Sequence, residues 1–248
     1  MLIDTHCHIH ESDFPLAVDE VLSRSVVADV TRMICVGTNI DSSAQAITFA
    51  DSHKGVFASI GVHPHDTKDG YAIESFAGTS EKIIAVGEIG LDYFYTNSPR
   101  EVQIEALKAQ LEVALAHNLP VIFHVREAFD DFWPIFDSYS GIRGVLHSFT
   151  DTKEQLDKAI ERGLYIGVNG ISTFSKNETQ KAMFDAIPID RLIFETDAPF
   201  LTPSPFRGKV NEPAFVRIIA EFHAERRGIS VDDISKTTTS NARTLFAI

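Results

Sequence analysis

Cysteine, long apolar stretches and basic residues are all scarce in this sequence of 248 residues. Its two cysteines, Cys7 and Cys35, are too few for a disulfide scaffold and suit a reducing compartment. Polar residues interrupt every apolar run well short of a membrane span, which excludes a transmembrane helix. Residues 1–6 have neither the basic opening nor the apolar stretch of a signal peptide. We therefore expect a soluble, cytoplasmic protein.

The shortage of basic residues narrows the class of partner. Lysine and arginine total 22 against 35 acidic residues, which gives a formal net charge of −13 with histidine neutral. Non-specific affinity for duplex DNA comes mainly from basic side chains that neutralise phosphates, so an extended duplex-binding surface is excluded. An enzyme that takes one phosphate into a pocket is not excluded, because bound divalent cations reverse the local charge.

Short apolar runs rich in β-branched residues recur along the chain. They predict strands near residues 2–4, 33–36, 56–60, 83–86, 121–124, 144–147, 164–168 and 192–195. The runs are continuously apolar, as expected for parallel strands buried on both faces, and their starts lie 20 to 38 residues apart. That spacing leaves room for a helix after each strand. We predict a (β/α)8 TIM barrel, with a doubly wound open sheet as the alternative.

Helix signals fall between these strands. Ile104, Leu107, Leu111 and Ala114 form one apolar stripe, and Thr152 with Gln155 resembles a capping box. Pro213 suits the first turn of a helix that Gly228 ends, and residues 231–248 predict an extra helical segment. No linker or low-complexity stretch interrupts the chain, so we expect one domain over residues 1–248.

Metal-ligand residue types lie where the predicted strands end. Active sites of such barrels are built at the carboxyl ends of the strands, so these side chains are expected to meet. His6 and His8, two residues apart on a strand, point to the same side. The other candidates are His63, Glu88, His124, His147 and Asp197. One or two such coincidences would be unremarkable, but this many favour a common site.

The number and type of these residues favour more than one metal ion. Even without His63, four histidines and two carboxylates exceed what a single ion with an open position needs. Nitrogen and oxygen ligands without thiolate suit Zn, Mn, Fe or Mg, and the sequence does not choose among them. Cys7 alternates away from His6 and His8, which indicates barrel packing. Two-ion sites are used to generate a hydroxide and to hold attacking and leaving oxygens.

The sequence resembles the TatD family of metal-dependent hydrolases along essentially its whole length. The matching segments are Asp4-Thr5-His6-Cys7-His8, Gly61-Val62-His63-Pro64, Gly87-Glu88-Ile89-Gly90-Leu91-Asp92, Phe123-His124-Val125-Arg126-Glu127-Ala128, His147-Ser148-Phe149, Glu195-Thr196-Asp197-Ala198-Pro199, Arg207-Gly208-Lys209-Val210-Asn211-Glu212-Pro213, and Asn241 with Leu245-Phe246. The resemblance implies a TIM barrel and a divalent-metal phosphodiesterase, in several members a 3′-to-5′ exodeoxyribonuclease.

The resemblance also implies a ligand set for two divalent ions, which would be Mg, Mn or Zn. His6, His8 and Asp197 would hold one ion, His124 and His147 the second, and Glu88 would bridge the two. The chain departs from the family pattern His-Cys-Phe-Thr-Gly at Ser148 and Asp151. The ligand His147 is retained, so we expect the metal site to stand, while Asp151 could alter substrate entry.

The mechanism that we expect is in-line hydrolysis of a phosphodiester. Asp197 would help to deprotonate the attacking water, and His63 would hold a phosphate oxygen or protonate the leaving group, with a plain backbone contact as the alternative for His63. Arg126 and Arg207 are candidates for binding the phosphate, or else form surface ion pairs.

Further interpretations concern residues outside the predicted ligand set. Asp92 and Glu195 are candidates for orienting metal ligands, or else make plain loop contacts. The stretch Tyr93-Phe94-Tyr95 could stack on a terminal base, but we favour loop packing. His223, in a polar stretch, is expected to be solvated, and His10 and His65 are left outside the site.

Three functions stay open at this stage. The first is a deoxyribonuclease that acts on DNA ends or single-stranded nucleic acid in an enclosed pocket. We also expect a monomer. The second keeps the metals but hydrolyses a carboxylic ester or amide, such as an aminoacyl-tRNA ester, because one barrel scaffold hosts many chemistries. The third is a non-enzymatic protein that metals stabilise and that acts through partners. No membrane partner is expected.

Overall fold

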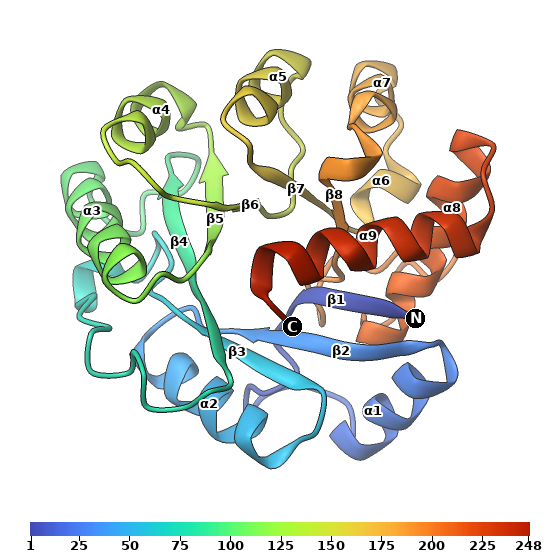
Figure 1. Ribbon diagram of the computed structural model, residues 1–248, viewed down its shortest axis with the longest axis horizontal. Helices are drawn as coiled ribbons and strands as arrows, with labels where there is room; N and C mark the ends of the chain where they lie inside the picture. Colours follow the sequence, from blue (N-terminus) through green and yellow to red (C-terminus); the bar gives the residue numbers. More distant parts are fainter. The chain divides into compact units, whose positions relative to one another are not determined.

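The computed structural model describes residues 1–248, whose eight β-strands follow one another in the sheet in chain order (Figure 1). The pairs β3–β4, β4–β5, β5–β6 and β7–β8 are parallel. An open doubly wound sheet would reverse its strand order part-way, so the (β/α)8 connectivity is the one present. The strands are β1 (Leu2–Cys7), β2 (Val30–Val36), β3 (Val56–Ile60), β4 (Ile83–Asp92), β5 (Val121–Arg126), β6 (Gly144–Leu146), β7 (Tyr165–Val168) and β8 (Leu192–Phe194).

The strand β4 is longer than the sequence predicts. Its apolar run ends at Val86, but the strand continues to Asp92 with every residue buried. The register with β5 shifts between Val86 and Ile89, which lets the pairing resume beyond Gly87. Glu88 and Asp92 therefore lie within a strand and not after one. His6 in β1 and His124 in β5 likewise lie inside their strands.

Helices follow the strands with one exception. The connection from β3 to β4 holds only a short 3₁₀ helix, η1 (Thr67–Asp69), so the expected α-helix there is absent. Pro64 and the glycines Gly70 and Gly78, both at positive φ, explain why no helix forms. The helices are α1 (Val18–Val27), α2 (Ile40–Ser52), α3 (Arg100–Ala116), α4 (Phe129–Asp137), α5 (Lys153–Glu161), α6 (Ile171–Phe174), α7 (Glu178–Ala186), η2 (Ile189–Arg191), η3 (Pro213–Phe215), α8 (Val216–Arg227) and α9 (Val231–Phe246).

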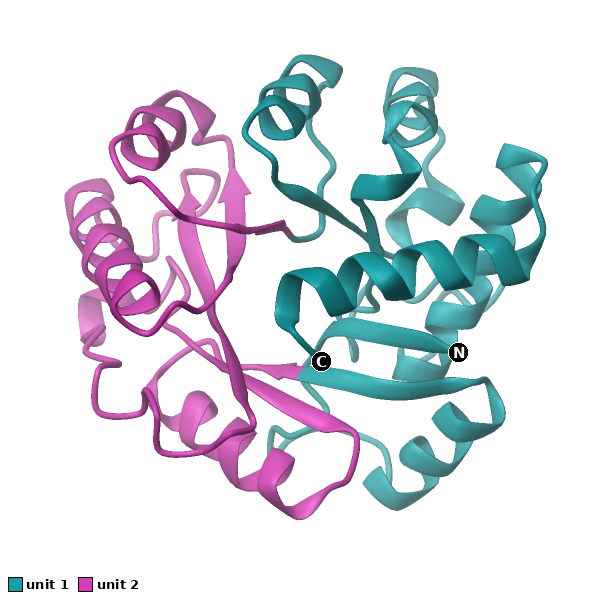
Figure 2. Ribbon diagram, in the orientation of Figure 1, with its two compact units in different colours: residues 1–34, 147–248 teal, residues 35–146 magenta.

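The chain forms two compact units, residues 1–34 with 147–248 and residues 35–146 (Figure 2). In the unit 35–146, α2 packs on β3, α3 on β4 and α4 on β5. The predicted stripe of α3 faces inward, since Leu107, Leu111 and Ala114 are buried. Aromatic rings of α4 pack on β5, with Phe132 and Phe123 at a centroid distance of 5.1 Å. The expectation of a single domain stays a prediction.

In the unit 1–34 with 147–248, the predicted C-terminal helical segment is α9, which lies against the first residues of two strands. Thr239 Oγ1 donates to the carbonyl of Met1, and Asn241 Nδ2 donates to that of Leu192. The predicted cap of α5 is also present, because Thr152 accepts from the N–H of Gln155 at 3.3 Å. No helix of the chain combines the length and apolarity that crossing a bilayer requires.

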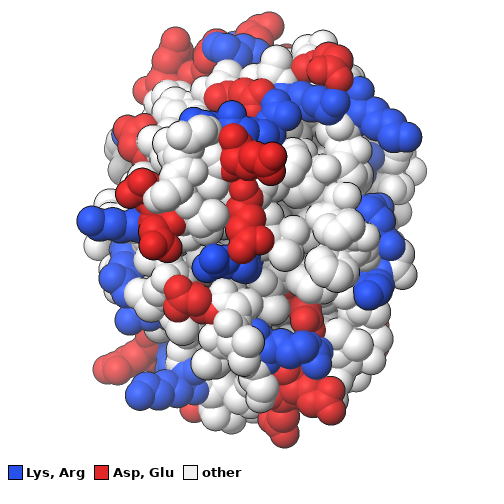
Figure 3. All heavy atoms as spheres, turned by 90° about the vertical axis from the view of Figure 1, so that its right-hand side faces the viewer, with Lys and Arg blue, Asp and Glu red and all other residues white.

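Charged side chains of both signs are interspersed on the face that Figure 3 shows, with neutral areas between them. Some charges of opposite sign on α7 and α8 form ion pairs. Arg217 Nε lies 2.7 Å from Glu221 Oε1, and Arg226 pairs with Asp185. Such exposed ion pairs contribute little to the stability of the fold. The mixture of charges therefore matters more for the kind of partner that can bind this face.

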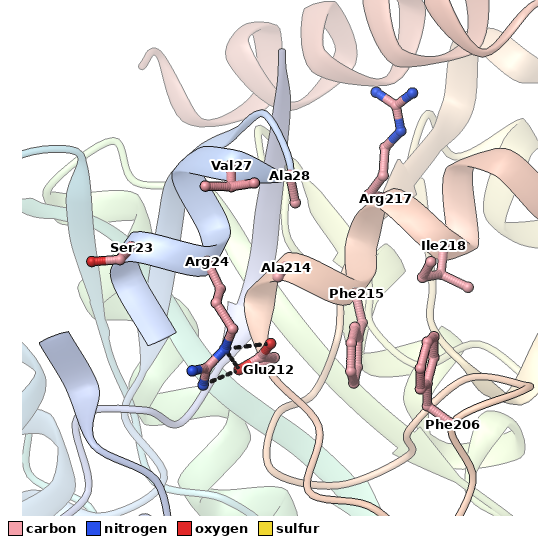
Figure 4. A pocket seen from close by; sticks show the side chains of 10 residues that line it. All are labelled: Ser23, Arg24, Val27, Ala28, Phe206, Glu212, Ala214, Phe215, Arg217 and Ile218. Atoms are coloured by element: carbon pink, nitrogen blue, oxygen red, sulfur yellow. Dashed lines mark hydrogen bonds and ion pairs between the residues drawn. The ribbon is translucent and has the colours of Figure 1, made fainter. Parts of the chain in front are cut away.

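A surface groove of about 380 Å³ between α1 and α8 contains a better-buried ion pair (Figure 4). Glu212, 8% exposed, accepts from Arg24 Nε at 2.8 and 2.9 Å and from Nη2 at 2.6 Å. The rings of Phe206 and Phe215 stack in the same groove at 5.0 Å. The pair therefore fixes the start of the segment that leads into α8.

We expect Arg24→Ala to lower the free energy of unfolding by about 1–2 kcal/mol, because it leaves a buried carboxylate without its donor. The value is at the low end for such losses, since Arg24 itself is 43% exposed. Arg217→Ala in the same groove is the matched control and should cost less than about 0.5 kcal/mol, because its partner Glu221 is exposed. Urea unfolding measures both free energies. Equal losses would contradict the claim that the buried carboxylate of Glu212 makes the loss of Arg24 more costly.

Candidate metal centre

His6, His8 and Asp197 converge at the ends of β1 and β8. His6 Nε2 lies 3.1 Å from His8 Nε2, and Asp197 Oδ1 lies 3.6 and 3.4 Å from those two atoms. Ligand atoms bound at about 2.1 Å in a tetrahedral site lie about 3.4 Å apart, so these separations fit a shared cation. As predicted, Cys7 turns away and is buried, with its thiol 3.4 Å from the carbonyl of Ile34.

A buried carboxylate two residues before His6 fixes this cluster. Asp4 Oδ1 accepts from the N–H groups of His6 and Thr196, and Asp4 Oδ2 accepts from Thr196 Oγ1. Burial raises the pKa of Asp4 to about 8, against the lowering effect of these hydrogen bonds. The N–H of Asp197 also donates to the carbonyl of His6 at 2.8 Å. The two ligand-bearing segments are therefore held together independently of any ion.

Asp197 sits on a strained backbone and stays ionised. Its φ of 59° lies in the left-handed region, which aspartate and asparagine tolerate better than most residues. Burial would raise the pKa of Asp197, but the hydrogen bond with His8 and the proximity of His6 and His147 lower it below its ordinary value. The side chain is thus a carboxylate, the form that a metal ligand or a base requires.

His147 joins this cluster from the end of β6. Its ring stacks on that of His6 at 4.0 Å, and its Nδ1 lies 3.5 Å from Glu195 Oε1. Glu195 is 1% exposed and also accepts from the N–H of Ser148 at 2.6 Å. Gly167 makes room for it, since a Cβ there would lie 2.5 Å from Glu195 Oε2. Glu195 thus lies beside His147, and its role in orienting that ring stays a prediction.

A second cluster lies in the unit 35–146. His124 Nδ1 lies 2.8 Å from Glu88 Oε1, and His63 Nε2 lies 3.5 Å from the same oxygen. The other nitrogen, His124 Nε2, lies 2.9 Å from Asp92 Oδ2. When Nε2 donates to Asp92, the lone pair of Nδ1 points toward the carboxylate of Glu88. This carboxylate–histidine arrangement orients metal-bound imidazoles in proteins.

Close contact between β4 and β5 brings these groups together. Gly90 has a φ of 153°, and a Cβ there would lie 1.8 Å from the carbonyl oxygen of His124. Only glycine allows this approach. Burial would raise the pKa of Asp92, but hydrogen bonds with His124 and the N–H of Tyr95, together with the proximity of His65, bring it below its ordinary value. Asp92 is therefore an anionic acceptor for both imidazoles.

The contacts of His63 show that its Nε2 is a hydrogen-bond donor. The backbone N–H of His65 donates to His63 Nδ1 at 3.2 Å, so the proton of a neutral His63 ring resides on Nε2. That Nε2–H faces Glu88 Oε1, and the side chain is 12% exposed. A histidine in this tautomer donates a hydrogen bond more readily than it binds a cation.

Both clusters have the donor chemistry of a divalent-cation site. The ligand atoms of His6, His8 and Asp197 lie within 4.8 Å of one another, as do those of the second cluster. All are imidazole nitrogens or carboxylate oxygens, with no thiolate among them. Such sets suit Zn, Mn or Fe, and the carboxylates also suit Mg.

Comparison of the whole sequence with a known protein family is consistent with a metal site. The profile of the family described as "TatD related DNase" matches residues 3–247. The chain belongs to the TatD family. It is accordingly a metal-dependent hydrolase, as the resemblance of its motifs predicts.

Relatives and solved structures of the TatD family cover the chain from end to end. It is 35% identical to the "Uncharacterized metal-dependent hydrolase YabD" of Bacillus subtilis, with all of both chains covered. It is 34% identical to the "3'-5' ssDNA/RNA exonuclease TatD" of Citrobacter rodentium, over all of this chain and 98% of that one. The crystal structure of the TatD homologue YJJV from Escherichia coli K12 superposes with a TM-score of 0.91 at 28% identity, over 100% and 98% of the chains. The predicted (β/α)8 barrel is thus confirmed as the fold class.

The TatD motifs account for most of the clustered residues, with some differences from the predicted grouping. His6, His8 and Asp197 meet as predicted, and His147 lies beside them against His6. Glu88 and His124 meet in the other unit, where Asp92 contacts His124; the predicted orienting role of Asp92 stays a prediction. The predicted pairing of His147 with His124, and the bridging role of Glu88, stay predictions.

Two further TatD motif residues, the candidate arginines, form no ion pair. Arg126 is exposed, and its guanidinium lies 3.8 Å from the ring centre of Phe94. Arg207 stacks on Phe174 at 3.8 Å and donates to the carbonyl of Thr202. The surface ion pair, which was the alternative for both, is therefore wrong.

Sequence reasoning missed His65 and misplaced His223. His65 Nε2 lies 3.1 Å from Asp92 Oδ2, on the oxygen that His124 also contacts. Its position two residues after His63 was the only available signal. His223 was expected to be solvated but is fully buried, because the face of α8 that carries it packs on Phe194 and Phe184.

Proposed function

We propose that the protein is a divalent-metal-dependent phosphodiesterase that removes nucleotides from the 3′ end of single-stranded nucleic acid. The observation that carries the proposal is the convergence of His6, His8 and Asp197, whose three ligand atoms lie 3.1 to 3.6 Å apart. A relative 34% identical over the whole chain is named a 3'-5' ssDNA/RNA exonuclease, which supports this choice of bond and polarity.

We propose two ions, one held by His6, His8 and Asp197 and one held with His124 and Glu88. Divalent ions in such sites lower the pKa of water and neutralise negative charge on phosphate oxygens. Three of these five ligands are imidazoles, which favours Mn or Zn over Mg as the native metal. Asp92 behind His124 and Glu195 behind His147 keep the imidazoles in one tautomer and orientation.

Two side chains act on the reacting groups in the proposed reaction. Asp197 is ionised, and Oδ1 faces the two histidines, which leaves Oδ2 to accept the proton of the attacking water. The water oxygen bonds to phosphorus, and the bond from phosphorus to the 3′ oxygen breaks. The Nε2–H of His63 donates a hydrogen bond to that leaving oxygen, which takes its proton from solvent. The products are a 5′-mononucleotide and a strand one nucleotide shorter with a 3′ hydroxyl.

The test uses metal-stripped protein and a single-stranded oligonucleotide labelled at its 5′ end. Addition of Mn²⁺, Zn²⁺ or Mg²⁺ in separate reactions should restore a ladder that shortens from the 3′ end. His124→Ala should abolish the ladder, while His117→Ala, an exposed histidine at the end of α3, should leave it intact. The readout is gel electrophoresis over time.

Three outcomes would contradict the proposal. A folded, metal-loaded protein that leaves single-stranded DNA and RNA uncut would refute it and favour a carboxylic ester or amide, such as an aminoacyl-tRNA ester. Cleavage that persists after chelation would exclude the metal role. Unfolding of the chain on chelation, without activity under any condition, would instead support metals with a purely structural role. The monomeric state and the cytoplasmic location stay predictions.

A further inference from the structure

Two large aromatic side chains are exposed directly after β4, beside the cluster of Glu88 and His124. Phe94 is 48% exposed and Tyr95 is 45% exposed, and their rings contact edge to face at 4.7 Å. Their neighbour Tyr93 packs instead, since its hydroxyl donates to Asp131 Oδ2 at 2.7 Å and its ring lies under Arg100. The loop packing favoured from the sequence thus holds for Tyr93 alone, and Phe94 and Tyr95 need another explanation.

The backbone that carries these rings is fixed by the site itself. The N–H groups of Phe94 and Tyr95 both donate to Asp92 Oδ1, at 3.0 and 3.1 Å. The other oxygen of the same carboxylate contacts His124 and His65. One buried carboxylate therefore sets both the orientation of His124 and the position of the two exposed rings.

Arg126 completes this surface with an unneutralised charge. Its guanidinium lies 3.8 Å from the ring centre of Phe94 and 5.1 Å from that of Tyr95. It is exposed and has no carboxylate partner, so its N–H groups are available to an anion. A guanidinium above an aromatic ring keeps its five N–H donors, which match the oxygens of a phosphate.

The surface is continuous with the cluster around His124. His65 contacts Tyr95 edge to face at 5.2 Å, and its ring centre lies 6.3 Å from that of His124. A ligand group on the rings and another at the cluster are thus separated by a single side chain. The aromatic rings, Arg126 and the cluster therefore belong to one stretch of surface.

We propose that Phe94, Tyr95 and Arg126 form a subsite in which an unpaired base of the substrate strand stacks and Arg126 holds the adjoining phosphate. The inference rests on the proposed function and deepens it, because it names the residues that bind a base and a phosphate of the substrate strand. Every base has a stacking face, so the subsite is indifferent to sequence. A base inside a duplex has its faces covered and does not enter.

The test measures how much the subsite speeds cleavage of a strand end that carries a base. Two single-stranded oligonucleotides are compared, identical except that one ends at its 3′ side in an abasic nucleotide. The intact protein should cleave the normal end about tenfold or more faster, in kcat/KM, than the abasic end. Phe94→Ala with Tyr95→Ala should lose most of that preference by slowing cleavage of the normal end to the rate of the abasic one.

Conservative and distant substitutions serve as controls. Phe94→Tyr and Tyr95→Phe keep a stacking face and should retain the preference, which a purely structural role of the loop does not predict. Val27→Ala removes an apolar side chain that is 89% exposed on α1 and should change nothing. Because both rings are exposed, the alanine variants should melt at the temperature of the intact protein.

The role of Arg126 has its own readout. Arg126→Ala should raise KM about tenfold and reduce the salt dependence of log KM by about 0.7, the value for one lost phosphate contact on a single strand. An unchanged preference for the base-bearing end in the double alanine variant would overturn the subsite while leaving the exonuclease intact. An intact protein that cleaves neither oligonucleotide would overturn the proposed function, and the subsite with it.

Discussion

Asp197→Asn should lower kcat/KM on an oligonucleotide by about 10³-fold while the protein keeps its fold. The substitution removes the negative charge and the proton acceptor, and groups in those roles contribute about 10²–10⁴-fold. Asparagine retains the shape of the side chain and tolerates the left-handed backbone at this position, where φ is 59°. Alanine would add backbone strain, so asparagine separates chemistry from folding.

The same variant should bind metal more weakly at one cluster only. Asp197 Oδ1 is one of three converging ligand atoms, so its neutralisation should reduce the bound metal measured by mass spectrometry from two ions toward one. Asp157→Asn removes an equal charge from the exposed face of α5 and should change rate and metal content less than twofold. Full activity of the Asp197 variant with two ions bound would show that Asp197 is neither a ligand nor the base.

The fold was predictable from the sequence because a buried parallel strand leaves a continuous apolar run. Six of the seven connections between strands hold α-helices where the spacing predicts them, and the predicted C-terminal helical segment follows β8. The extension of β4 was not predictable, since Gly87 and Gly90 normally indicate the end of a strand. Here they permit the close approach to β5 that buries Glu88 and Asp92. The two glycines that ended the predicted strand are therefore the residues that allow Glu88 and Asp92 to reach the site.

The clustering of the candidate ligands was predictable for a different reason. Polar residues at the ends of apolar strands have no role in the core, so their repetition indicates chemistry. The same reasoning gave Asp92 and Glu195 as orienting groups, which the contacts with His124 and His147 support. It could not give His65 or the exposure of Phe94 and Tyr95, because these depend on how the loop after β4 turns on Asp92.

His223 shows the limit of reading polarity along one helix. Its neighbours in sequence, Glu221, Glu225 and Arg226, are charged, which suggested a solvated side chain. The ring instead lies among Phe184, Phe194 and Phe222, and its Nε2 lies 2.9 Å from Ser172 Oγ. His223 lies on the buried face of α8 with Ile219, Ala220 and Ala224. The charged residues beside it in sequence lie on the other face and hide this from the sequence alone.

Burial of His223 should make the protein lose stability as the pH falls below about 6.5. Burial lowers the pKa of His223 to about 3, and Arg227 and Arg226 on α8 add to this while Asp185 on α7 opposes it. The folded protein thus keeps the ring neutral, whereas the unfolded chain protonates it near pH 6.5. Between these pKa values the unfolded state binds one more proton, so the free energy of unfolding decreases toward low pH.

The expected loss from this residue is about 4 kcal/mol between pH 6.5 and pH 3, at about 1.4 kcal/mol per pH unit. His223→Gln preserves a hydrogen bond to Ser172 but does not titrate. It should be less stable than the intact protein at pH 7, through poorer packing, and should lose less stability on acidification. His117→Gln controls for the removal of one histidine, since His117 is exposed at the end of α3. Urea unfolding at a series of pH values measures each slope, and parallel curves for the intact protein and His223→Gln would place the source of acid sensitivity elsewhere.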